Sequence, residues 1–81
     1  MDMDIRLKVI SPERIEFQGN VKSVLVPGTL GQFEILRNHA PIISALTKGD
    51  VVYDDGEKHT VSINAGFVSV KDNQVNVCVE L

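Results

Sequence analysis

The chain has 81 residues, 43% of them apolar, and its eight basic and eleven acidic side chains give a formal charge of −3. This length allows one domain, residues 1–81, with a thin core, and it excludes a second lobe. The slight acidic excess and only four aromatic residues exclude the basic stripe and the stacking platform of a nucleic-acid binder.

The first four residues, Met1 to Asp4, include two acids. They lack the basic segment and the following apolar stretch that a secretory signal needs. No later stretch reaches the ~18 consecutive apolar residues of a membrane span. We therefore expect a soluble, intracellular protein that does not insert into a membrane.

Alternation of apolar and polar side chains dominates the chain from residue 5 onward, and it is typical of strands with one buried face. It predicts short strands, in chain order, around Ile5 to Val9, Ile15 to Phe17, Val21 to Val26, Phe33 to Ile35, Val51 to Tyr53, Val61 to Ile63, Val68 to Val70 and Val75 to Leu81. The stretch from Gln32 to Ala40 suits either a strand leading into a loop or a single helical turn, and we favour the strand.

Turn residues separate these strands at short intervals. Asp54-Asp55-Gly56 predicts a hairpin, because glycine adopts the positive φ that tight turns require, and Lys71 to Gln74 predicts a second one. Further breaks are expected at Ser11-Pro12-Glu13, Gln18-Gly19-Asn20, Pro27-Gly28 and Lys48-Gly49-Asp50. Strands at this spacing, without an amphipathic helix, predict an all-β fold: a small antiparallel β-sandwich of about 8–10 short strands, or a small barrel.

Residues suited to catalysis or metal binding are scattered. Ser44, His39 and His59 lack the strained Gly-x-Ser-x-Gly turn that presents a nucleophile. A metal site built from His39, His59 and Cys78 would need ligands from three distant segments with no closely spaced pair. His59 follows a predicted turn beside Lys58, so we expect a solvated surface histidine. The sequence thus predicts no enzyme activity, no cofactor and no metal.

One ordered series of motifs is more specific than any of these features. It consists of Ser11-Pro12-Glu13, Phe17, Ser23 to Gly28, Gly31 to Pro41 with the tripeptide His39-Ala40-Pro41, and Asn64-Ala65-Gly66-Phe67-Val68. In order and spacing the series resembles the epsilon subunit of F-type rotary ATP synthases over nearly the whole chain.

Some positions depart from the family pattern. The family motif G-E-F-G is replaced here by Gly31-Gln32-Phe33-Glu34. The family's P-G before the histidine is replaced by Arg37-Asn38. Asn38 suits that place because asparagine enters the left-handed region more readily than other non-glycine residues. The family usually continues into a two-helix C-terminal domain, whereas this sequence ends at Leu81, so we expect neither its inhibitory nor its nucleotide-binding role.

The resemblance implies a non-catalytic central-stalk (rotor) subunit that clamps the gamma subunit to the c-ring and supports coupling of ion transport to ATP synthesis. Such a subunit is peripheral, at the cytoplasmic face of the inner (plasma) membrane. Family contacts to gamma map onto Ser11, His39 and Ser44, and contacts to the polar loops of the ring map onto Gly31, Gln32, Phe33 and Glu34.

Plainer roles stay open for two of these residues. His39 also suits a loop histidine that is satisfied by the backbone, and Phe33, which alternates with Ile35, suits an ordinary core position. The alternative function is a free-standing β-sandwich domain that binds a small ligand or acts as a carrier.

Overall fold

The structure, a computed structural model, describes residues 5–81, so the expectation for Met1 to Asp4 lies outside the described residues. Its nine strands are β1 (Ile5–Ile10), β2 (Ile15–Val21), β3 (Ser23–Gly28), β4 (Gly31–Ile35), β5 (Ile42–Leu46), β6 (Gly49–Asp54), β7 (Lys58–Ile63), β8 (Ala65–Lys71) and β9 (Gln74–Glu80). Within residues 5–81 there is no helix, and hence none long and apolar enough to cross a membrane. The all-β prediction is confirmed.

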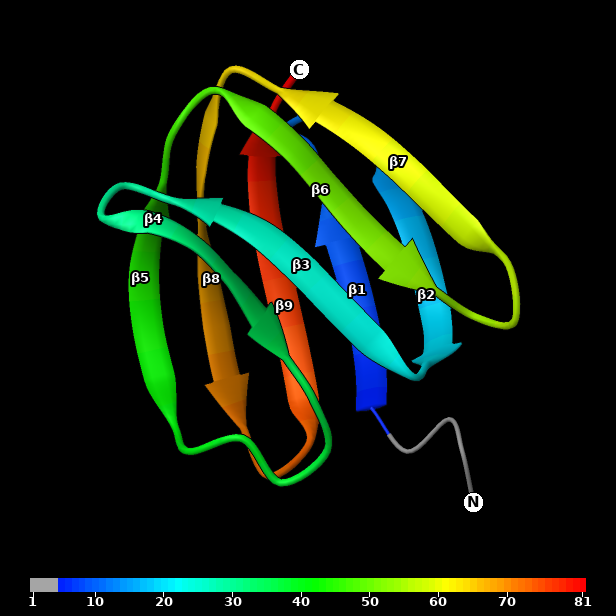
Figure 1. Ribbon diagram of the computed structural model, residues 1–81. Coiled ribbons are helices and arrows are strands. Elements are labelled where there is room, and N and C mark those ends of the chain that lie inside the picture. The colour runs from blue at the N-terminus through cyan, green and yellow to red at the C-terminus, as the bar shows by residue number, and fades with distance from the viewer. Residues whose placement is uncertain (1–4) are drawn as a thin grey trace.

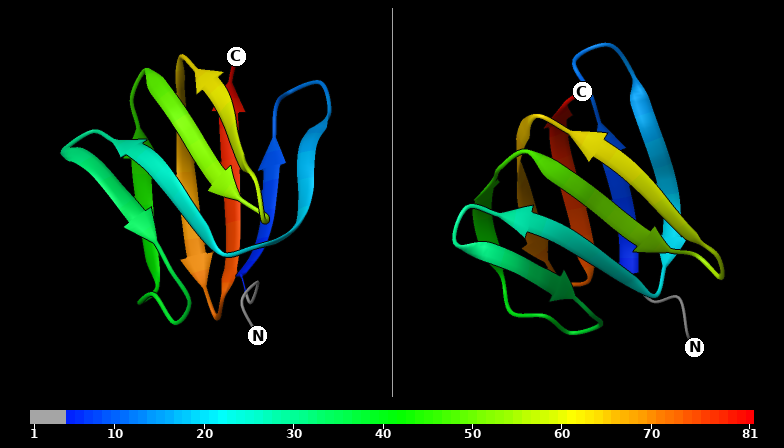
Figure 2. Two further views of the ribbon diagram at one scale, coloured as in Figure 1. Left: turned by 45° about the vertical axis from the view of Figure 1, so that its right-hand side comes forward. Right: turned by 45° about the horizontal axis from the view of Figure 1, so that its top comes forward.

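The strands form one hydrogen-bonded sheet that curls into two facing layers (Figure 1). The strand order is β2-β1-β9-β8-β5-β3-β6-β7, and β4 pairs with β3 beside this path. We call β2, β1, β9, β8 and β5 the five-stranded layer, and β4, β3, β6 and β7 the four-stranded layer. Strands of the two layers cross obliquely (Figure 2). The layers join where Gly28 of β3 pairs with Leu46 of β5, and the amide of Thr47 donates to the carbonyl of Pro27 at 2.8 Å.

One strand pair departs from the predicted antiparallel arrangement. β1 and β9 run parallel, with Leu7 opposite Val75 and Val9 opposite Val77. These strands begin and end the described part of the chain, so no tight turn joins them, and a parallel pair is possible because the connection between its strands is long.

The core lies between the layers and is made almost entirely of branched aliphatic side chains. Its buried members are Ile5, Leu7, Val9, Val21, Val24, Val26, Ile35, Leu46, Val51, Tyr53, Ile63, Val68, Val70, Val75, Val77 and Val79. These positions follow the period of two along each strand, which confirms that the alternation in the sequence marks the buried face.

Two predicted boundaries are wrong. Gln18-Gly19-Asn20 does not break the chain, because β2 runs through it and pairs with β1 as far as Val21. A Cβ at Gly19 would lie 3.1 Å from Cζ of Phe17, so this glycine makes room for a ring rather than a turn. The run from Val21 to Val26 belongs to two strands, divided at Lys22, whose amide donates to the carbonyl of Asp54 at 2.7 Å.

Strand β5 was not predicted at all. In Ile42–Leu46 a serine occupies the middle inward position, so the apolar alternation is too short to stand out. The predicted strand over the start of the ambiguous stretch is confirmed, since β4 ends at Ile35 and a loop follows.

Both predicted hairpins are confirmed. The turn between β8 and β9 places Asp72 at φ 52° and Asn73 at φ 61°, the two consecutive positive values of a turn that follows the sheet twist. Between β6 and β7 Gly56 has φ 112°, a conformation that side-chain-bearing residues rarely adopt.

Candidate functional site

An apolar row crosses the outer face, by which we mean the surface of the five-stranded layer that points away from the four-stranded layer. Residues directly opposite each other on paired strands project on the same side of the sheet. The pairings join Ala45 to Phe67, Phe67 to Cys78, Cys78 to Ile10 and Ile10 to Ile15. These five residues are the apolar row, and with strands about 4.8 Å apart the row is about 19 Å long.

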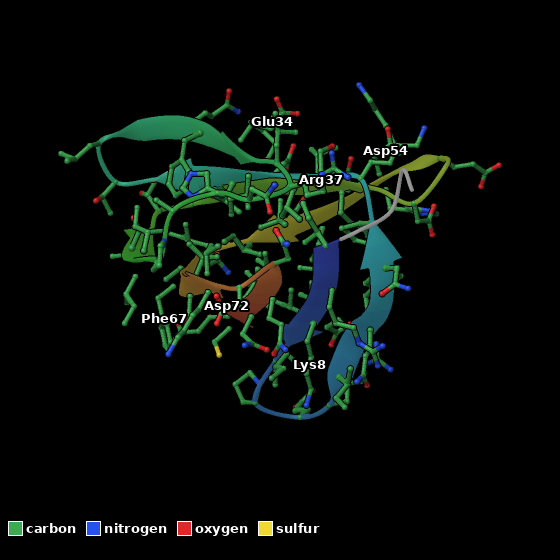
Figure 3. All side chains as sticks on the ribbon, turned by 90° about the horizontal axis from the view of Figure 1, so that it is seen from below. Lys8, Glu34, Arg37, Asp54, Phe67 and Asp72 are labelled. Atoms are coloured by element: carbon green, nitrogen blue, oxygen red, sulfur yellow. The ribbon has the colours of Figure 1, made fainter. Side chains whose placement is uncertain are left out.

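The apolar row is open to solvent. Phe67 is 50% exposed and Ile15 is 49% exposed, and Ile43, one row away on β5, is 80% exposed. Phe67 points away from the four-stranded layer (Figure 3). An open groove of about 510 Å³ lies beside the row, with Ile10, Phe67 and Cys78 among its walls. Large apolar side chains gathered on one exposed face are typical of an interaction site.

Ser11 lies at the end of this face but is buried within its own loop. β1 and β2 pair through a bulge in which Val9 faces Phe17 and Ile10 faces Ile15, so that Glu16 is the extra residue. The hydroxyl of Ser11 donates to Oε2 of Glu16 at 2.9 Å, and Nε of Arg14 donates to the same oxygen at 3.1 Å. Ser11 therefore shapes the loop rather than projecting from it, and its contact with gamma stays a prediction.

This loop gives a testable electrostatic effect. The hydrogen bond from Ser11, and after it the one from Arg14, lowers the pKa of Glu16 below its ordinary value. A carboxyl whose pKa is lowered in the folded state stabilises the fold above its unfolded pKa, and this contribution is lost as the pH falls through the folded pKa. We expect Ser11→Ala to return the pKa of Glu16 toward its ordinary value. The free energy of unfolding of this variant should then fall less than that of the wild type when the pH is lowered from neutral to acid.

An NMR titration of the Glu16 carboxyl and urea unfolding at neutral and acid pH measure the two effects. Ser69→Ala, which removes a hydroxyl from β8, is the matched control and should leave the titration unchanged. An identical Glu16 pKa in wild type and Ser11→Ala would contradict the assignment.

His39 lies at the opposite end of the sandwich, in the loop between β4 and β5. Asn38 adopts φ 65°, as its place in the motif predicts. Its amide donates to Oδ1 of Asn73 at 2.6 Å, while Nδ2 of Asn73 donates to Oδ1 of Asn38 at 3.2 Å, which ties this loop to the β8–β9 turn. The half-buried His39 ring has Nδ1 2.7 Å from the carbonyl oxygen of Ala40 and a centroid 6.5 Å from that of Phe33.

Ser44 is the middle residue of β5 and pairs with the buried Val68, so it projects toward the core. Its hydroxyl donates to the carbonyl of Ala45 at 3.2 Å. The residues of β5 on the outer face are its neighbours Ile43 and Ala45, which sequence reasoning missed. Ser11, His39 and Ser44 thus lie at separate places on the five-stranded layer and its ends, and the fold does not gather them into one cluster.

The hairpin between β3 and β4 presents a second exposed surface. Leu30 at its tip is fully exposed, at 103%, and Gly31 has φ 130°. Gln32 and Glu34 are exposed and pair with Pro27 and Leu25, which places both side chains on the outer side of the four-stranded layer.

Phe33 faces the other way and packs against the core, as its alternation with Ile35 suggests. Leu30 was not predicted as a contact residue either. It belongs to a turn, where the period of two carries no information about exposure.

The expectation for His59 is wrong in part. Its half-buried ring stacks on Tyr53 at 5.1 Å between centroids, and its Nε2 lies 3.0 Å from Oδ1 of Asp55. The Tyr53 ring in turn lies 4.3 Å from that of Phe17, which links β6 of one layer to β2 of the other. Burial, and after it the charge of Asp55, raises the pKa of Tyr53. This stack packs together the two ends of the curled sheet.

Side chains that bind metals are not grouped in the described part of the chain. Across residues 5–81, no three His, Cys, Asp or Glu side chains are arranged to hold a metal ion. Apolar residues do gather, in the apolar row, which suits contact with another protein.

Residues 4–81 match the family described as ATP synthase, delta/epsilon chain, β-sandwich domain. The chain is 43% identical over 77 residues to the ATP synthase epsilon chain of Leptospira interrogans, covering 94% of this chain and 61% of that one. It is 41% identical over 78 residues to the epsilon chain of a Nitratiruptor species, covering 94% and 60%. The chain thus spans about three fifths of the length of these relatives.

The fold is similar to chains of two solved assemblies. One is the mitochondrial ATP synthase of Euglena gracilis, resolved as OSCP, F1 and c-ring: its TM-score is 0.88 at 21% identity, covering 95% of this chain and 51% of that chain. The other is the central stalk and c-ring of the Tetrahymena thermophila mitochondrial ATP synthase, with a TM-score of 0.83 at 12% identity and coverage of 99% and 66%. At these identities the likeness shows the fold alone, and it confirms the predicted β-sandwich.

Proposed function

The chain belongs to the β-sandwich family of ATP synthase delta/epsilon chains, and on this basis we propose that it is a non-catalytic central-stalk subunit of a rotary ATP synthase. In this role it clamps the gamma subunit to the c-ring and so supports the coupling of ion transport to ATP synthesis. It acts as a peripheral component at the cytoplasmic face of the membrane.

The observation that supports the gamma contact within this proposal is the apolar row. A domain of this size buries only about 60% of the surface of its unfolded chain, so a partner that covers an apolar face adds to its stability. The apolar row and Ile43 offer one such face, bounded by the loops that hold Ser11 and His39. We assign gamma to this outer face.

The c-ring contact is assigned to the β3–β4 hairpin. Leu30, Gln32 and Glu34 are exposed there, and they belong to the four-stranded layer rather than to the outer face of the five-stranded layer. Because the two surfaces lie on different layers, gamma and the ring can be held at the same time, as a clamp requires.

A charge placed in each surface tests the proposal. Phe67→Asp is expected to weaken gamma binding about thirtyfold or more, the ~2 kcal/mol of an interface hot spot, because binding would bury an unpaired carboxylate. Glu34→Lys should leave gamma binding intact but weaken association with a gamma–c-ring subcomplex, and more strongly at low salt.

The affinity of each variant for gamma is measured by its binding to surface-immobilised gamma. Association with the gamma–c-ring subcomplex is measured by co-purification. Thr60→Asp adds the same charge as Phe67→Asp on β7 of the other layer and is the matched control. Wild-type gamma affinity in Phe67→Asp would remove the outer face from the proposal.

The small-ligand alternative has less support. The groove beside the apolar row has the volume of a ligand site, yet binding sites also need free polar groups to fix a ligand. The Ser11 hydroxyl in its wall is already bonded to Glu16.

A further inference from the structure

Basic side chains lie along one side of the apolar row. Lys8 faces Gln18 on β2 and Asn76 on β9, in the row next to the apolar one. Arg6 and Lys71 both face Gln74, one row further on. We call Arg6, Lys8 and Lys71 the basic group. Lys8 projects from the outer face on the same side of the molecule as Phe67 (Figure 3).

Among residues 5–81 the basic group faces no acidic residue within its rows, and the carboxylate at its edge is Asp72, which follows Lys71 in the β8–β9 turn. The other residues of these rows on β2, β8 and β9 are uncharged: Gln18, Asn20, Ser69, Gln74 and Asn76. The ion pairs found in the described part of the chain join Arg14 to Glu16 and His59 to Asp55, and neither includes the basic group.

The basic charges also lie close enough to repel one another. Positions two apart on a strand are about 7 Å apart, and positions two strands apart about 10 Å, so Arg6 lies within about one Debye length of both Lys8 and Lys71. A carboxylate brought next to them would relieve this repulsion. On the other side of the apolar row the corresponding charge is acidic, Glu80 opposite Ala65.

The opposite surface of the molecule has the reverse charge. Glu34, Asp50 and Asp54 project from the four-stranded layer, with Lys58 opposite Asp54. Glu34 and Asp54 lie on the side of the molecule away from Lys8 and Phe67 (Figure 3). The two broad faces therefore differ in charge as well as in apolar character, although the chain as a whole carries only −3.

We propose that the outer face recognises a gamma surface in which an apolar stripe is bordered on one side by carboxylates, which pair with Arg6, Lys8 and Lys71. This inference rests on the proposed function, because it takes gamma as the occupant of the outer face. The charges on the two sides of the apolar row fix which way round gamma lies, since the reversed orientation would place its carboxylates against Glu80. Electrostatic attraction also speeds association, whereas the acidic face repels the same partner.

Charge reversal at one exposed position on each face tests this inference. The probe is the gamma subunit encoded in the same genome, and the full 81-residue chain is used throughout. Lys71→Glu and Lys8→Glu are each expected to raise the Kd for gamma about tenfold at about 0.05 M salt, with a much smaller difference at about 0.5 M. Lys58→Glu changes the net charge by the same amount on the other layer and should not raise the Kd.

The outcomes separate the two proposals. Lys71 is exposed, so that variant reports on the interface even if Lys8→Glu, whose side chain is half-buried, fails to fold. Wild-type affinity and salt dependence in Lys71→Glu, while Phe67→Asp still loses gamma, would overturn the charge pairing and leave the proposed function standing. No binding of gamma by the wild-type chain, or occupation of the outer face by a second copy in sedimentation experiments, would overturn both.

Discussion

Replacing Leu7 by alanine is expected to lower the free energy of unfolding by about 3 kcal/mol, within the range measured for leucine-to-alanine changes in cores. Leu7 is fully buried in β1, the strand between β2 and β9. Its partners across the sheet are Gly19, which has no side chain, and Val75, which is already packed. Neither residue directly opposite can therefore fill the cavity, and most of the cost should appear.

This loss is large for a chain of this size. At roughly 0.05–0.15 kcal/mol per residue, a domain of about 80 residues is stable by ~4–12 kcal/mol. Urea unfolding followed by circular dichroism measures the change, and the slope of the transition should stay the same.

Ile43→Ala is the matched control for Leu7→Ala, because it also shortens an aliphatic side chain but at a position that is 80% exposed. A surface change of this kind should alter the free energy of unfolding by no more than about 0.5 kcal/mol. Equal losses in the two variants would mean that β1 is not the buried strand described here.

Replacing Gly66 by alanine is expected to destabilise the fold by about 3 kcal/mol or more, at the upper end of overpacking effects. A Cβ at this position would overlap the carbonyl oxygen of Cys78 and lie 3.2 Å from Cα of Val79. Both are backbone atoms of the paired strand β9, so the strain can be relieved only by moving β8 away from β9.

That movement would also reach the interaction surface, because Phe67 and Cys78 are neighbours in the apolar row. We therefore expect Gly66→Ala to weaken gamma binding as well as to lower the melting temperature. Gly19→Ala is the control: its Cβ would meet the far end of the Phe17 ring, which can swing aside, so the cost should be about 1 kcal/mol. A Gly66→Ala protein as stable as Gly19→Ala would contradict the close approach of β8 and β9.

The sequence by itself determined the features that depend on neighbouring residues. Alternation in Ile5 to Val9 and in Val75 to Val79 identified β1 and β9 and their buried faces, because successive side chains of any strand point to opposite sides. The prediction is wrong for Leu81, which lies beyond β9 and is 56% exposed. Turn chemistry located both hairpins, at Gly56 and at Asp72-Asn73, because a positive φ is a property of single residues. The ordered motifs led to the family through the same local information.

The tertiary structure decided the features that depend on pairing between distant strands. β5 is held as a strand by β8, and β2 continues through Gly19 because β1 pairs with it. Ser44 projects toward the core because of the register between β5 and β8, and Ser11 is buried because of the bulge at Glu16. Neither the register nor the bulge can be read from a single segment.

The candidate interaction site could not be predicted from the sequence for the same reason. The apolar row takes one residue from each of five strands, and between Ile10 and Cys78 it joins positions 68 residues apart. In the sequence these five residues lie apart, and none of them is adjacent to another. They form a surface only because hydrogen bonding between strands aligns one residue of each strand with one residue of the next.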